Sequence, residues 1–75
     1  MNQERKFESL AKSLLKAELR RRNLTYADLT TKLNEAGAAE SEPNVRNKIS
    51  RGKFSASFFL SCLDAIAVST LHITD

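Results

Sequence analysis

The segment from residue 41 to residue 54, SEPNVRNKISRGKF, gathers side chains that could bind an anionic polymer. It contains two asparagines and four cationic residues, and after Glu42 no acidic residue follows until Asp64. Asparagine amides pair well with adenine in a DNA major groove, whereas arginine and lysine suit guanine or phosphate oxygens. The chemistry open to this segment is therefore reversible binding through hydrogen bonds and charge.

Charge is distributed in blocks along the chain of 75 residues, whose net charge is +3. Residues 1–24 carry seven cations and three acids, residues 25–42 one cation and four acids, and residues 43–58 four cations and no acid. Clustered cations favour a polyanionic partner, with nucleic acid the first candidate and an acidic protein the second. The alternative, that the cations only solvate two helix faces, stays open from charge alone.

No arrangement of residues in the sequence indicates covalent or metal chemistry. The chain has one cysteine, Cys62, and one histidine, His72, which cannot make an internal disulfide or a credible metal site. Neither a Ser/His/Asp set nor a glycine-rich loop is visible. We therefore expect no enzyme activity, no catalytic residue, no metal, no cofactor and no small-molecule ligand, with Cys62 in the core.

The apolar segments of the sequence are short. The first ten residues, MNQERKFESL, are charged and lack the apolar run of a secretory signal. The longest apolar runs, residues 58–60 and 65–68, are too short to cross a bilayer. The sequence therefore predicts a cytoplasmic protein that does not engage a membrane.

Apolar residues recur at steps of three and four, which predicts helices and no strand. We expect a first helix at about residues 3–22, a second over 26–36, a third over 43–51, a fourth over 56–67 and a short C-terminal turn over 70–74. The fold class is then all-α, with four to five helices in a single domain that spans residues 1–75.

Residues typical of helix starts precede three of these segments. Thr25 is followed three residues later by Asp28, a short version of the capping box. Ser41 or Glu42 is expected to cap the third helix ahead of the proline that follows, and Ser55 the fourth.

Two glycines and an aromatic pair mark the remaining boundaries. Gly37 and Gly52 are expected to end the second and third helices, because glycine readily adopts the left-handed conformation of a helix end. Phe54, just before the fourth helix, is expected to pack on Phe59 as a hydrophobic staple.

The third helix has one apolar and one polar face. At about 100° per residue, Val45 and Ile49 lie about 40° apart and should point inward. The outward face is then formed by Asn44, Asn47, Lys48 and Arg51, while Arg46 lies on a flank.

Several motifs of the chain, in order, resemble a known DNA-binding fold. A basic first helix ends before Leu24-Thr25, a third helix closes with Arg51-Gly52, and the fourth ends in residues 67–69, Ala-Val-Ser. This order is similar to the helix-turn-helix domain of the lambda-repressor and Cro superfamily. Residues 14–68 resemble, more narrowly, a bacterial domain family of unknown function within that superfamily.

The resemblance implies that the third helix enters the major groove while the start of the second faces the phosphate backbone. Base-reading positions would be Asn44, Asn47, Lys48 and Arg46. Phosphate-binding positions would be Thr25, Tyr26, Arg51 and Lys53.

This sequence departs from the superfamily pattern in three ways. Tyr26 stands where glutamine is usual, the connection between the second and third helices is longer, and the inward residues of the third helix are four apart. The longer connection carries Glu40 and Glu42, whose charges would repel DNA unless they point away.

The sequence favours a sequence-specific DNA-binding protein that regulates transcription in a bacterium or prophage, with double-stranded DNA as partner. The alternative is an interaction module of the same fold that binds an acidic protein, such as a toxin or a transcription-machinery subunit. A homodimer is possible. Its contacts would come from Phe7, Leu10, Leu71 and Ile73, unless these cover one another within one chain.

Overall fold

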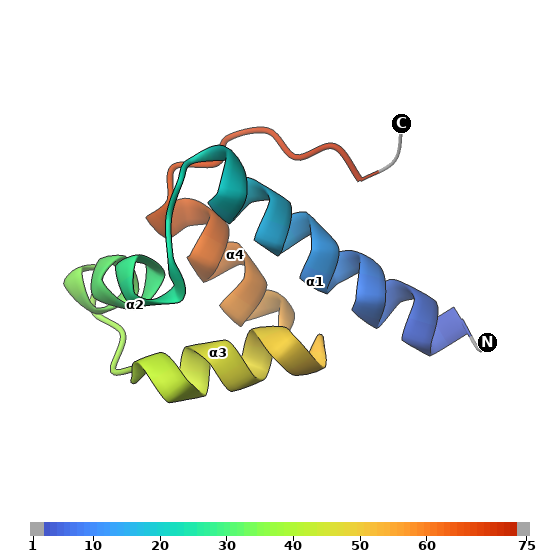
Figure 1. Ribbon diagram of the computed structural model, residues 1–75, viewed down its shortest axis with the longest axis horizontal. Coiled ribbons are helices and arrows are strands. Elements are labelled where there is room, and N and C mark those ends of the chain that lie inside the picture. Colours follow the sequence, from blue (N-terminus) through green and yellow to red (C-terminus); the bar gives the residue numbers. More distant parts are fainter. Residues whose placement is uncertain (1–2, 74–75) are drawn as a thin grey trace.

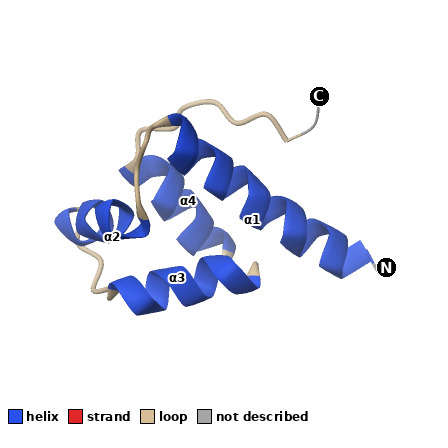
Figure 2. Ribbon diagram, in the orientation of Figure 1, coloured by secondary structure: helices blue, strands red, loops and turns tan. Residues whose placement is uncertain are grey.

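The computed structural model describes residues 3–73 and contains four helices in that range, with no strand (Figures 1 and 2). They are α1 (Gln3–Arg21), α2 (Tyr26–Glu35), α3 (Glu42–Arg51) and α4 (Ala56–Ala65). Both α1 and α2 pack on α3 and on α4. In the view of Figure 1, α3 lies at the bottom and the segment after α4 runs back across the top. The expected all-α class is confirmed.

Side-chain caps begin α2, α3 and α4, as the sequence predicted. The Thr25 hydroxyl accepts a hydrogen bond from the Asp28 N–H, and Ser41 and Ser55 accept from the residues three positions later. Such bonds satisfy amides that have no partner within the first turn of a helix. The third helix starts at Glu42, one residue earlier than expected, because Ser41 and not Glu42 is its cap.

Helices α1, α2 and α4 end in the same backbone motif. The residues just past their ends, Asn23, Gly37 and Ala67, have φ values of 57°, 105° and 61°. In each case the next residue donates its N–H to a carbonyl five positions back, as in a Schellman motif. Gly37 was predicted as a stop, whereas the left-handed Ala67 ends α4 at Ala65, two residues before the expected boundary.

The first and second helices also end one residue earlier than expected, at Arg21 and Glu35. The predicted turn over residues 70–74 is wrong for residues 70–73, which form no helical turn, and residue 74 lies outside the described range. The extended course of this segment lets Leu71 pack against the core instead.

One apolar core joins all four helices. Its buried members are Leu15, Leu19, Leu29, Leu33, Val45, Ile49, Cys62, Leu63 and Ile66. Burial raises the pKa of Cys62 to about 12, so the thiol stays neutral and behaves as a small core residue, as expected. Phe54 stacks on Phe59 with ring centroids 5.7 Å apart, which confirms the predicted staple.

The N-terminal half of α1 extends past this core (Figure 1). Phe7, one of the residues proposed for a dimer contact, is 50% exposed, and the buried residues of α1 begin at Leu15. Within residues 3–73, no helix combines the length and the apolar character that a membrane crossing demands.

Close contact between Gly52 and the backbone of α1 fixes the C-terminal end of α3. Gly52 has φ of 68°, and a Cβ atom placed on it would lie 2.6 Å from the carbonyl oxygen of Glu8. Backbone atoms cannot yield as the end of a side chain can. Any larger residue would therefore push α3 away from α1.

Gly52→Ala should lower the free energy of unfolding by roughly 3 kcal/mol, combining left-handed backbone strain with overpacking. Gly37→Ala is the matched control, because Gly37 also has positive φ but no atom lies within 4 Å of the point that a Cβ atom would occupy. Urea denaturation of both variants measures the difference. Equal losses would mean that the contact with Glu8 does not restrain α3.

Candidate functional site

The outward face of α3 carries the amide groups that the sequence analysis singled out. Val45 and Ile49 are both 0% exposed and hold the helix against the core. Asn44, Asn47 and Arg51 are exposed on the opposite side. The geometry therefore leaves two amides and one cation free to meet a partner.

Lys48, a predicted base reader, is directed to one flank of α3. Its ammonium lies 2.7 Å from a carboxylate oxygen of Glu40 and 4.8 Å from the ring centroid of Phe58. Glu40 is held in place by Asn34, which exchanges two hydrogen bonds with the Glu40 backbone, at 2.9 and 2.8 Å. The longer connection between α2 and α3 thus places the Glu40 carboxylate next to the Lys48 ammonium, and the two groups form an ion pair.

Arg46, another predicted reader, is directed to the opposite flank. Its guanidinium lies 2.6 Å from the Glu42 carboxylate and 5.8 Å from the ring centroid of Tyr26. Arg46 and Glu42 are one turn apart on α3, so the pair forms within the helix. Both acids of the connection are therefore engaged with cations of α3, and they do not lie free beside its amides.

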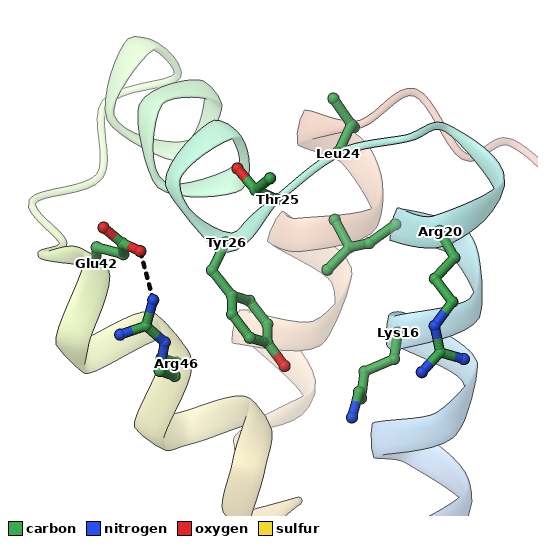
Figure 3. Close-up of a pocket in the computed structure, with 8 residues that line it drawn as sticks. Lys16, Arg20, Leu24, Thr25, Tyr26, Glu42 and Arg46 are labelled. Carbon is green, nitrogen blue, oxygen red and sulfur yellow. Dashed lines mark hydrogen bonds and ion pairs between the residues drawn. The ribbon is translucent and has the colours of Figure 1, made fainter.

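The predicted phosphate-binding residues fall into two groups at opposite ends of α3. Thr25 and Tyr26 lie near its start, whereas Arg51 and Lys53 are exposed on either side of Gly52 at its end. Tyr26 is half-buried and its ring packs against the core. Its hydroxyl end points toward α1 (Figure 3).

Thr25 is occupied by the capping box. Its hydroxyl accepts from the Asp28 N–H at 3.1 Å, and its own N–H donates to the Asp28 carboxylate at 2.9 Å. The backbone N–H of Thr25, and then its side chain, hold the pKa of Asp28 below its ordinary value of 3.8. A carboxylate therefore covers the N-terminus of α2, which weakens the case for Thr25 as a phosphate ligand.

Sequence reasoning missed two cations of α1 that lie near this point. Lys16 and Arg20 line a hollow of about 270 Å³ between α1, the start of α2 and the start of α3. The other residues that line it are Leu19, Leu24, Thr25, Tyr26, Glu42 and Arg46. Arg20 lies in the basic run that ends α1, where cations complement the helix dipole, and this structural explanation favoured it less as a phosphate ligand. The available signal was the spacing of Lys16 and Arg20, which puts both on one face.

The four residues proposed for a dimer contact differ in exposure and do not line one hollow. Phe7 is 50% and Ile73 is 59% exposed, whereas Leu10 and Leu71 are half-buried. Leu71 and Ile73 line a hollow with apolar residues of α4, and the two residues of α1 are not part of it. Leu71 is already packed on the core of its own chain.

Residues 7–71 match the family model of a domain of unknown function, DUF6471. The match covers most of the chain, so the protein belongs to this family. No match was found among curated proteins or among solved structures. The family agrees with the expected similarity to a domain family of unknown function.

Thr25→Ala should lower the free energy of unfolding by about 1 kcal/mol, the usual cost of losing a side-chain cap. Thr25→Ser is the control and should be close to wild type, because serine keeps the accepting hydroxyl. Thermal or urea unfolding at neutral pH measures both. Equal stability of all three proteins would show that the capping box does not stabilise α2.

The same box predicts a pH dependence. Because the folded-state pKa of Asp28 is depressed, its carboxylate stabilises the fold above about pH 4 and loses this effect on acidification. The stability difference between wild type and Asp28→Asn should therefore shrink as the pH falls below that value.

Proposed function

We propose that the protein is a sequence-specific DNA-binding protein, with α2 and α3 acting as a helix-turn-helix of the lambda-repressor and Cro type. In this proposal α3 enters the major groove, and the protein regulates transcription in a bacterium or prophage by occupying its site, without a cofactor. The observation that carries the proposal is the orientation of α3. Val45 and Ile49 are fully buried, while Asn44 and Asn47 are exposed.

Asn44 and Asn47 are the first candidates for reading bases in this proposal. The two acids that precede or begin α3, Glu40 and Glu42, are paired with Lys48 and Arg46 and not with these amides. An asparagine side chain can both accept from and donate to adenine in the major groove. Arg51 and Lys53, exposed at the end of α3, suit the neighbouring backbone.

Arg46 and Lys48 take part only after their ion pairs open. The Arg46–Glu42 pair is at the surface, with side chains 53% and 40% exposed, whereas in the Lys48–Glu40 pair Lys48 is 43% and Glu40 only 16% exposed. An exposed pair such as Arg46–Glu42 contributes about 0–1 kcal/mol. Several phosphates or a guanine edge would therefore compete with Glu40 and Glu42 for the two cations. The two ion pairs are therefore expected to reduce the affinity for DNA moderately and not to abolish it.

The second candidate function is a module of the same fold that binds an acidic protein partner. It is favoured by one observation, that two of the four expected base readers are held by carboxylates of their own chain. An acidic protein needs only positive charge and shape, whereas base reading needs free donors at fixed positions.

Selection of binding sites from a pool of random DNA separates the two candidates. An enriched sequence supports DNA recognition, and a palindrome would also reveal two half-sites read by a dimer. Absence of binding to any duplex at low salt, where non-specific contacts are strong, would exclude the first candidate. Recovery of an acidic protein, with no such DNA binding, would favour the second.

Asn47→Ala should relax the base preference at one position of the selected site, with a loss of roughly 1–3 kcal/mol in discrimination.

Lys53→Ala should weaken binding to all DNA sequences by the same factor and reduce the salt slope of binding by about 1. Fluorescence titrations against the selected site and a scrambled site measure both effects. Lys32→Ala removes the same charge from the last turn of α2 and should change neither quantity.

Identical discrimination by wild type and Asn47→Ala would mean that this amide does not face the bases. A site-dependent effect of Lys53→Ala would mean that the end of α3 does more than hold the backbone.

A further inference from the structure

The hollow at the head of α3 is lined by three cations and one acid. Lys16 and Arg20 come from α1, whereas Arg46 and Glu42 come from the first turns of α3. The Glu42 carboxylate is already paired with Arg46. Lys16 and Arg20 therefore leave a positive charge at this point of the surface that no acid of the hollow cancels.

Neither Lys16 nor Arg20 has a carboxylate partner among residues 3–73. They stand four positions apart on one helix, so their charges repel each other at close range. Figure 3 shows the Lys16 side chain reaching toward the hydroxyl end of Tyr26 and the Arg20 side chain running along α1 toward Lys16. An anion in the hollow would relieve this repulsion and could accept hydrogen bonds from all three groups.

Two arginines that follow Arg20 at the end of α1 are neutralised by a carboxylate of that helix. Arg21 and Arg22 both bind the carboxylate of Glu18, which is only 5% exposed. Arg20, the first residue of the same basic run, receives no such partner within the described range. The unpaired state of Lys16 and Arg20 is therefore a local feature and not the general rule for the end of α1.

We propose that this hollow binds a phosphate group, with Lys16 and Arg20 as its principal ligands and the Tyr26 hydroxyl as a further donor. The hollow has a volume of about 270 Å³ and is open to solvent, so a phosphate group can enter it. Arginine binds phosphate through parallel N–H bonds, and lysine does so as a point charge.

If the proposed function holds, the phosphate bound in the hollow belongs to a DNA strand next to the groove that α3 enters. Contacts to phosphate fix the position of a protein on the duplex, and contacts to bases then specify sequence. The phosphate also competes with Glu42 for Arg46, at the surface pair described above. Binding at the hollow would thereby release Arg46 beside the exposed Asn47.

The test compares two double variants that lose the same charge. Lys16→Gln with Arg20→Gln removes the proposed ligands, and Lys6→Gln with Lys32→Gln removes two cations that do not line the hollow. Circular dichroism first verifies that both proteins fold. Each is then titrated with inorganic phosphate, followed by amide NMR, and with a short duplex of mixed sequence over a range of salt concentrations.

Wild type and control should show saturable phosphate shifts at the amides of Leu24, Thr25 and Tyr26, and the Lys16/Arg20 variant should lose them. Its salt slope for the duplex should fall by about 0.9, the value for one phosphate contact, while the control keeps the wild-type slope. Loss of shifts without a change of slope would identify free phosphate, and not the DNA backbone, as the ligand.

The phosphate site and the DNA-binding function can be disproved independently of each other. Saturable phosphate shifts that depend on Lys16 and Arg20, in a protein that binds no duplex, would retain the phosphate site and overturn the DNA proposal. Duplex binding in which the Lys16/Arg20 variant matches wild type in both titrations would retain DNA binding and overturn the phosphate site. A wild type with neither response would overturn both.

Discussion

The burial of Val45 and Ile49 is the constraint on which the arrangement of the surface depends. They are the only buried residues of α3, a helix of ten residues whose other positions, apart from Pro43, are polar or charged. Burying two such side chains stabilises the contact by roughly 1.5–3 kcal/mol each. The contact of Gly52 with the α1 backbone fixes the other end of the helix. Together they determine which side chains of α3 face α1, α2 and the solvent.

Ion pairs neutralise some of the cations in the basic blocks of the sequence and not others. Glu18 neutralises Arg21 and Arg22 on α1, and the acids of the connection meet Lys48 and Arg46. Cations that look alike in the sequence are consequently different on the surface. Beside the head of α3, Lys16 and Arg20 of α1 contribute positive charge that these ion pairs do not neutralise.

Features that depend on residue type and on neighbouring residues could be predicted from the sequence. Features that depend on the backbone conformation, or on contacts between residues distant in the sequence, could not. Hydroxyl caps and the inward pair of α3 follow from residue type and helical spacing, so they were foreseen. Ala67 was not, because alanine carries no signal for the left-handed conformation that ends α4. Nor could the Glu40–Lys48 pair be foreseen, because it spans eight residues and depends on hydrogen bonds from Asn34 to the connection.

The two flanks of α3 therefore have different partners. On one flank Arg46 and Glu42 border the hollow beside α1, and on the other Lys48 lies over Phe58 of α4. The strip left between them is narrow and is formed mainly by Asn44, Asn47 and Arg51. Two amides discriminate few base pairs, since each good base contact adds only about 1–3 kcal/mol. If α3 reads bases as proposed, a specific complex built on this strip would have to draw positional accuracy from phosphate contacts on α1, and the longest helix would then belong to the recognition surface as well as supporting it.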